Sequence, residues 1–329
     1  MLATPAHVVS NRLAECLRAR SIVARFSAQD PHVAKCRNTG FCKFTIRLHL
    51  HAAERPGGVL VEVQRMYGDC MSFMQDCQAL LNAAEGKAGE GTIGEDKPLY
   101  LRLPVSQMEF LKTASLPPTS PQEEADAVAV TAELLASQRS DTNRLGMESL
   151  VIQTDPLKTL KSTAVLISQR ILCPNDPGNE AFNVHNYVMS LLIYGGEDPP
   201  SPYPEDSALE DHYASLRILG LQALSNALAL LAAEDLLPTA LSPHGEWYAS
   251  VLVVCLLRDL GAATHRPLEA CYASRCLAVL AGSSADLAAK VKAAGGSDAV
   301  AHAEGVGMRE FALLARDAGH CRNTLSCCV

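Results

Sequence analysis

Apolar residues fall on every second position between residues 44 and 51, which is the pattern of a β-strand with one buried face. One predicted face is apolar and the other is polar. The apolar face holds Phe44, Ile46, Leu48 and Leu50, and the polar face holds Arg47, His49 and His51. The turn Arg55-Pro56-Gly57-Gly58 follows, and then a second alternating run from Val59 to Val63. The sequence therefore predicts a β-hairpin.

After Gly68 the apolar period changes to that of a helix. The predicted buried stripe is Phe73, Cys77, Leu80, Leu81 and Ala84. Residues 72–75 match a capping box, and Gly86 stands where a C-terminal cap glycine belongs. Because a lone hairpin is unstable in water, we expect this helix to cover its apolar face. Residues 1–86 are thus predicted as a small α+β module, strand–strand–helix, with an N-terminal helix.

Residues 87–124 show no hydrophobic period and are predicted as a linker. The segment begins with the Gly-rich run KAGEGTIGED and ends in a proline cluster at residues 116–121. Residues 89–94 match G-x-G-x-x-G, but this run follows a helix and does not follow a strand. We therefore interpret it as linker and not as a dinucleotide site.

From residue 125 to residue 329 the helical period persists. Helices are expected near 126–138, 143–152, 179–193, 207–232, 246–260, 267–281, 284–294 and 308–322. Thr154-Asp155-Pro156 predicts one more, with Asp155 as its N-cap. Several of these helices are apolar nearly all round, which is typical of stacked helical hairpins, although a closed bundle would give the same local pattern. The expected fold class is mainly α, with armadillo-like stacked helical hairpins preceded by the α+β module.

Charge is distributed unevenly between these parts. The net charge is −8, with 48% apolar and 5% aromatic residues. Residues 1–86 hold ten Lys/Arg against seven Asp/Glu, and residues 87–329 hold 18 against 29. An acidic second part argues against a nucleic-acid surface there, because phosphate binding needs clustered positive charge.

Cysteine usage and the N-terminus bear on the compartment. The twelve cysteines include no C-x-x-C pair, and the N-terminus lacks the pattern of a secretory signal, so we expect a cytoplasmic protein with reduced thiols. Residues 1–29 contain four arginines and one acid, Glu15, which leaves an organelle transit peptide open beside an ordinary helix. The stretch 249–257, apolar apart from Ser250, is about half a membrane span, so no transmembrane helix is expected.

The helical part resembles armadillo repeats in residues 134–141, 145–150 and 273–294. Such repeats have a Leu-rich core and small Ala or Gly residues at the contacts between helices. The resemblance implies a non-catalytic scaffold that binds extended peptides or other proteins along a groove. Peptide-binding members carry a ladder of Trp and Asn on their inner helices. In this chain Asn226 and Trp247 are the candidates for that role, with no further Trp to extend the ladder.

The first module is similar, in the order of its elements, to the lipid-binding domain at the C-terminus of some protein kinases. The shared features are a strand, a turn, Val63-Gln64-Arg65-x-x-Gly68-Asp69 and a helix opening with Phe73. The resemblance implies binding of acidic phospholipids, for which Lys43, Arg47 and Arg65 are the candidate residues. This chain has no kinase, and the module stands at its start.

Candidate chemistry elsewhere is sparse. Cys36, Cys42, His49 and His51 match no standard zinc spacing and are interpreted as buried thiols and solvated histidines. The sequence has no G-x-S-x-G or Walker motif. We therefore expect a protein-interaction scaffold that is not an enzyme, without cofactor, metal or nucleic acid. A peripheral adaptor on anionic membrane and an enzyme with an unrecognised site are the alternatives.

Overall fold

The computed structural model describes residues 4–26, 30, 32–51, 58–87, 121–173, 183–194, 208–242 and 245–327. The chain divides into two compact units. The first comprises residues 1–117 with 307–313, and the second comprises residues 118–306 with 314–329. Most of the predicted linker, 88–120, lies outside the described residues.

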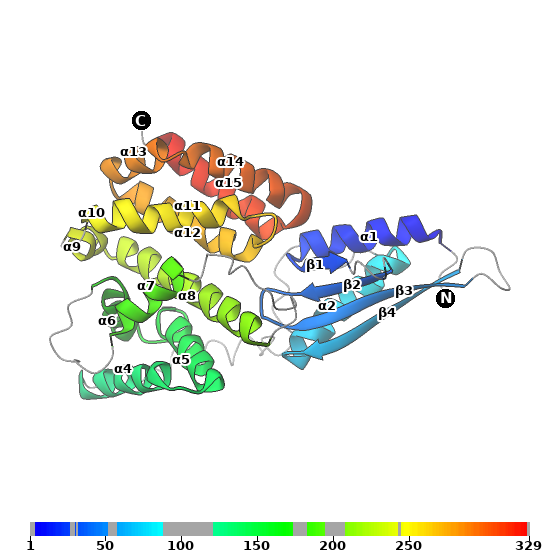
Figure 1. The fold of residues 1–329 in the computed structure, drawn as a ribbon, viewed down its shortest axis with the longest axis horizontal. Coiled ribbons are helices and arrows are strands. Elements are labelled where there is room, and N and C mark those ends of the chain that lie inside the picture. Colours follow the sequence, from blue (N-terminus) through cyan, green and yellow to red (C-terminus); the bar gives the residue numbers. More distant parts are fainter. Residues whose placement is uncertain are drawn as a thin grey trace, which may run out of the picture. The chain divides into compact units, whose positions relative to one another are not determined.

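The first unit consists of a sheet and two helices. The elements are α1 (Ala6–Ala19), β1 (Val23–Phe26), β2 (Val33–Arg37), β3 (Lys43–His51), β4 (Gly58–Tyr67) and α2 (Cys70–Glu85). Among the described residues, the strands form one antiparallel sheet in the order β1-β2-β3-β4 (Figure 1). The predicted hairpin is β3 and β4, and the sheet extends it by two strands that the hydrophobic pattern did not reveal.

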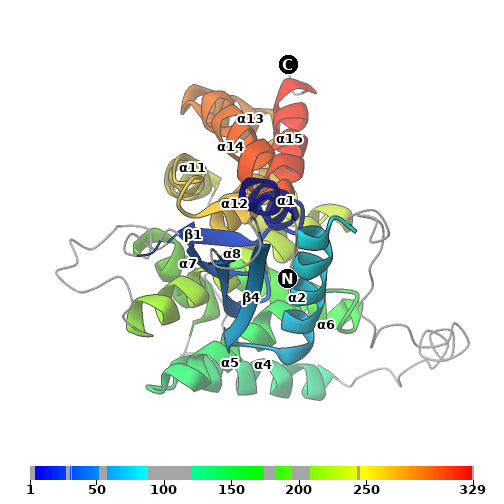
Figure 2. The same ribbon diagram turned by 90° about the vertical axis from the view of Figure 1, so that its right-hand side faces the viewer.

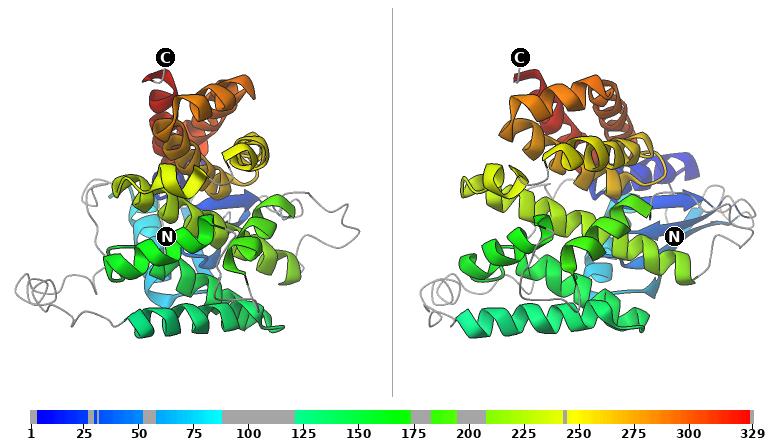
Figure 3. Two further views of the ribbon diagram at one scale, coloured as in Figure 1. Left: turned by 90° about the vertical axis from the view of Figure 1, so that its left-hand side faces the viewer. Right: turned by 60° about the vertical axis from the view of Figure 1, so that its left-hand side comes forward.

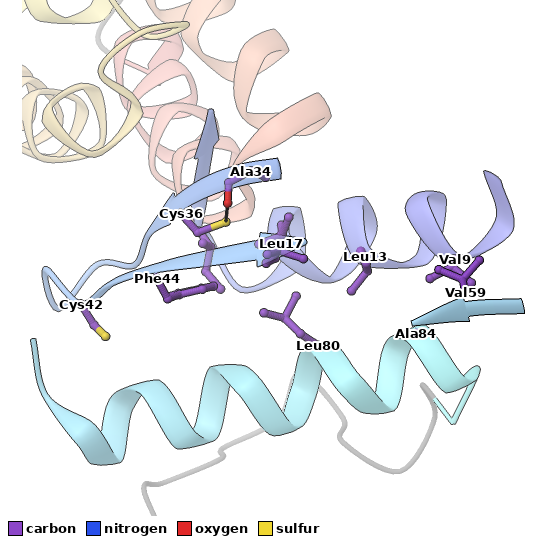
Figure 4. Packing of buried hydrophobic residues seen from close by; sticks show 12 residues of the cluster. Val9, Leu13, Leu17, Ala34, Cys36, Cys42, Phe44, Val59, Leu80 and Ala84 are labelled. Carbon is purple, nitrogen blue, oxygen red and sulfur yellow. Dashed lines mark hydrogen bonds between the residues drawn. The ribbon is translucent and has the colours of Figure 1, made fainter. Parts of the chain in front are cut away.

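Both helices pack on one face of this sheet, and α1 and α2 lie side by side (Figure 2). Leu13 and Leu17 of α1 point toward the side of Leu80 of α2, and Phe44 of β3 lies beside Leu80 (Figure 4). Phe44 and Ile46 are buried, as their alternation predicts, whereas Leu50 near the end of β3 is 54% exposed. Burial of one sheet face under two helices gives the unit its core.

The connection between β4 and α2 is short and depends on Gly68. Its φ is +103°, and a Cβ there would lie 2.6 Å from Cys42 Cα. Asp69 then caps α2, accepting a hydrogen bond from the Ser72 N–H (2.6 Å). The helix thus begins before the predicted capping box at residue 72, because Asp69 is an N-cap acceptor three residues upstream. Gly86 ends the helix in the left-handed conformation, as predicted.

A buried polar network fixes the β2–β3 turn to the helices. The Asn38 amide donates to Ser72 Oγ and Asp76 Oδ2 (both 2.7 Å) and accepts from the N–H groups of Gly40 (3.0 Å) and Cys42 (2.9 Å). Arg20 Nε, at the end of α1, donates to Asp76 Oδ1 (2.8 Å). Both N–H donors and both acceptor positions of the amide are hydrogen-bonded, so its burial leaves no polar group unsatisfied.

The described residues of the second unit are helical. The elements are α4 (Pro121–Ala136), α5 (Ser140–Gln153), α6 (Lys161–Leu172), α7 (Val184–Tyr194), α8 (Ala208–Ala233), α9 (Leu237–Leu241), α10 (Gly245–Trp247), a π-helical turn (Tyr248–Leu252), α11 (Val253–Gly261), α12 (Pro267–Ser283), α13 (Ala285–Ala293), α14 (Gly296–Glu310) and α15 (Ala312–Cys327). The division assigns the last turn of α14 and the first residues of α15 to the first unit. In Figure 3 these elements run from α4 and α5 in green to α15 in red. The prediction of a mainly α fold is confirmed, and armadillo-like stacking of the helices stays a prediction.

Helix α8 is the central element of the second unit, packing against α5, α6, α7 and α12. Its stretch from His212 to Ala233 has the length and apolar composition of a membrane span, with mean hydropathy 1.5. However, 72% of the tested window is buried inside the unit. Its apolar character is accounted for by neighbours on all sides.

Three details of the second unit differ from the prediction. Asp155 does not cap a helix: α6 begins at Lys161, and Asp155 Oδ1 instead accepts from the Leu157 N–H (3.0 Å) in a turn that leaves Leu157 93% exposed. Helix α4 begins at Pro121, inside the range predicted as linker. Helix α14 runs from Gly296 to Glu310, over residues between the helices predicted near 284–294 and 308–322, where none was expected.

Candidate anion-binding face of the sheet

The face of the sheet opposite the helices is built from alternating residues of the four strands. Directly paired residues of neighbouring strands share a face. The register pairs Val23 with Arg37, Arg37 with Lys43, and Lys43 with Tyr67, which makes one row across β1, β2, β3 and β4. Because Phe44 next to this row points into the core, the row belongs to the open face.

The further rows of this open face add more cations. Arg25 pairs with Lys35 and Lys35 with Thr45, and Arg47 lies between Val33 and Glu62. The Lys and Arg residues of the open face are Arg25, Lys35, Arg37, Lys43 and Arg47. Glu62 is the one carboxylate at these paired positions among the described residues. We call this set of five cations the basic face.

The single carboxylate of the face is already engaged. Glu62 Oε2 lies 2.9 Å from His49 Nε2, and both side chains are about half exposed (45% and 46%). Arg37 and Arg47 form no ion pair with any described residue. Their positive charge is therefore available to an anion from solution.

The structure brings two of the three predicted lipid-binding residues together. Lys43 and Arg47 lie on the basic face, with Thr45 between them on β3. Arg65 pairs with Phe44 on the helix-covered side, because it continues the alternation of Val61 and Val63, which pair with Leu48 and Ile46 on that side. Its Nη1 donates to the Gly68 carbonyl (2.7 Å), so its side chain stabilises the β4–α2 connection.

The remaining cations of the face come from β1 and β2, which the sequence analysis did not recognise as strands. In Val33-Ala34-Lys35-Cys36-Arg37 the buried positions are Ala34 and Cys36. The period of two is present there, but its apolar residues are small and the strand has five residues. A search for Lys or Arg alternating with Ala or Cys next to a predicted hairpin would have found it.

The two residues predicted for a peptide groove lie in the second unit. Asn226 of α8 is half-buried, and its amide faces Val151 O (3.4 Å) and Thr154 Oγ1 (3.3 Å) of the neighbouring segment. Trp247 of α10 packs beside His185 and Tyr248, with ring centroids 6.0 and 5.3 Å away. Both side chains contact the unit's own helices, and their role in peptide binding stays a prediction.

Two cysteines of the first unit, Cys36 and Cys42, belong to its core. Cys36 and Cys42 are buried, and burial raises the pKa of the Cys36 thiol to about 12. Such a thiol stays protonated at neutral pH and is neither a nucleophile nor a metal ligand. Within the described part of the chain, no group of three or more His, Cys, Asp or Glu side chains could hold a metal ion.

The chain was compared with known proteins at three levels. No family model matches the sequence, no curated protein matches it, and no solved structure matches the fold.

Proposed function

We propose that this protein is a non-catalytic interaction scaffold that docks on anionic membrane surfaces through the basic face of its N-terminal sheet. The observation that carries the proposal is the gathering of five Lys/Arg side chains on one sheet face, with the two helices on the other. The helical second unit is the part we assign to protein partners.

The size of the electrostatic attraction supports this function. A Lys or Arg close to an anionic bilayer contributes about 1 kcal/mol, and five of them on one flat face act together. The charges must share a face because salt screens attraction beyond the Debye length, which is about 8–10 Å at physiological salt. Only charges on one face can all lie within that distance of the same membrane plane. A sheet face supplies such a plane.

Nucleic acid is a weaker candidate for the same face. Sheets that bind single strands stack bases on aromatic side chains. Apart from the imidazoles of His49 and His51, the one aromatic ring at the paired positions of this sheet face among the described residues is Tyr67, at the end of β4. A charged plane without a stacking platform favours lipid headgroups.

Vesicle co-sedimentation of the full chain tests the function. We expect pelleting with phosphatidylserine-containing vesicles and none with pure phosphatidylcholine. Arg37→Glu with Arg47→Glu should abolish it. Arg139→Glu with Lys290→Glu, which alters two exposed cations of the second unit by the same charge, should leave it unchanged.

Three results would overturn the proposal. The wild type could fail to pellet with anionic vesicles, or the two double variants could behave alike. The third result is that the wild type binds a single-stranded oligonucleotide but does not pellet with vesicles. If Arg37→Glu with Arg47→Glu then loses the oligonucleotide, the face is a nucleic-acid interface.

A further inference from the structure

An exposed apolar corner adjoins the basic face where β4 leads into α2. Met66 and Tyr67 end β4 and are 64% and 57% exposed, and Met71 and Met74 on the first turns of α2 are 45% and 55% exposed. We call these four residues the methionine corner. They fall within nine positions of the chain, on either side of the Gly68-Asp69 connection.

The corner is held in place by the surrounding structure. The bulge in the β3–β4 register sets Met66 outside the paired positions, and Gly68 turns the chain against Cys42. Met71 and Met74 are three residues apart and so share one face of α2, while Phe73 between them packs on Phe44 in the core. A rigid edge thus presents long, flexible apolar side chains to solvent.

Charge complementarity indicates what covers this corner. Tyr67 stands in the same row as Lys43 and Arg37, so the corner continues directly from the cationic end of the basic face. Apolar side chains that border a plane of cations match the two layers of an anionic bilayer, in which acyl chains lie under negative headgroups. Tyrosine, with an apolar ring and a polar hydroxyl, is enriched at that boundary.

We infer that the methionine corner inserts into the headgroup–acyl boundary of an anionic bilayer at the β4–α2 edge of the sheet, while the cations of the basic face in the row of Tyr67, Lys43 and Arg37 contact the headgroups. The inference deepens the proposed function and rests on it. The corner supplies an apolar contribution that salt does not screen, and the basic face supplies the preference for anionic lipid. Binding therefore needs both surfaces.

The test uses the full chain and phosphatidylserine-containing vesicles. Met71→Gln with Met74→Gln should lower the partition coefficient about tenfold (~1.4 kcal/mol). The control, Leu145→Gln with Ile152→Gln, alters two apolar side chains of the second unit that are 55% and 47% exposed and should bind like the wild type. In a Trp247→Phe background, the emission of Met74→Trp should shift to the blue and be quenched by brominated lipid.

The outcomes separate this inference from the function on which it rests. If Met71→Gln with Met74→Gln binds like the wild type and the indole emission of Met74→Trp does not move, while Arg37→Glu with Arg47→Glu loses binding, the corner does not insert and the docking function stands. If the wild type does not bind anionic vesicles, both fail. A third outcome is that the wild type sediments as a dimer and does not bind vesicles. If Met71→Gln with Met74→Gln then makes the protein monomeric, the corner binds a second copy of the chain.

Discussion

Single residues in this protein carry constraints that come from backbone geometry and not from side-chain chemistry. Gly68 is the sharpest case, because its φ of +103° is disfavoured for other residues and its missing Cβ leaves room for the Cys42 backbone. The position lies between the last strand and α2, so it sets how the methionine corner and the basic face meet.

Gly68→Ala should therefore destabilise the first unit. Strain at a positive φ together with a contact of 2.6 Å to a backbone atom predicts a loss of about 2–4 kcal/mol in the free energy of unfolding. Amide hydrogen exchange of residues 33–46 is the measurement, because the single Trp lies in the second unit.

The matched control is Gly261→Ala at the end of α11, where an added Cβ meets no atom within 4 Å. We expect it to change stability by less than about 1 kcal/mol, in the stabilising direction. Equal protection of residues 33–46 in Gly68→Ala and the wild type would contradict the strain argument.

At the scale of elements, the second unit uses buried charges to end one of its helices. The carbonyls of Leu192 and Ile193 in the last turn of α7 accept from Arg258 Nη2 (3.0 and 3.1 Å), and Leu192 O also from Arg217 Nη2 (3.3 Å). Arginine is suited to this because its several donors can satisfy the free carbonyls of a helix end. The two arginines come from α8 and α11, so the cap joins three helices.

The anionic partner of this cap is Asp259, whose Oδ1 lies 2.6 Å from Arg217 Nη2 with both side chains almost fully buried. Burial raises the pKa of Asp259 to about 6, and the opposing attraction of Arg217 does not cancel the effect. Arg258, Arg266 and Glu269 are the other charged groups near this carboxyl. The free-energy cost of desolvating the carboxylate thus exceeds its electrostatic attraction to the neighbouring arginines.

The sign of the resulting pH dependence follows from this raised pKa. The folded chain holds the Asp259 proton more tightly than the unfolded chain, whose Asp pKa is about 4, so this group's contribution to stability is greatest at low pH. It declines as the pH rises through about 6. The unfolding free energy of Asp259→Asn minus that of the wild type should therefore increase by about 2 kcal/mol between about pH 4 and pH 7.

Urea unfolding of both proteins across this pH range measures the difference. Asp286→Asn, which removes an exposed partner of Lys290, is the control and should change by less than about 1 kcal/mol. A difference that falls with rising pH would mean that Arg217 keeps the carboxyl ionised and that burial is the smaller effect.

At the scale of the whole molecule, the chain divides into two units whose charges differ in sign. The cationic surface lies in the first unit, and the acidic excess lies in residues 87–329. This separation allows a chain of net charge −8 to present a basic face.

Limited proteolysis of the full chain checks this organisation. The Gly- and Pro-rich composition of residues 87–120 predicts first cuts within 86–95 and 113–120. The structure moves the second boundary to before Pro121, where α4 begins. First cuts within α6, at residues 161–172, would contradict the division.

Local patterns by themselves determined much of this protein. The β3–β4 hairpin, the Gly86 cap and the helical character of the residues after 124 follow from periods of 2.0 and 3.6 and from cap chemistry, which act over a few neighbouring residues. Lys43 and Arg47 could be assigned to one strand face for the same reason. These features need no knowledge of what lies across the fold.

Tertiary structure decided which residues share the candidate surface, because the sequence of one strand does not determine which strand it pairs with. Only the sheet brings Arg25, Lys35 and Arg37 beside Lys43 and Arg47, and only the register shift between Lys43 and Phe44 leaves Met66 unpaired and puts Tyr67 opposite Lys43. The Arg217–Asp259 pair joins residues 42 positions apart and had no local signature. Which side chains share a surface is set by packing between distant segments, and the candidate site of this protein is such a surface.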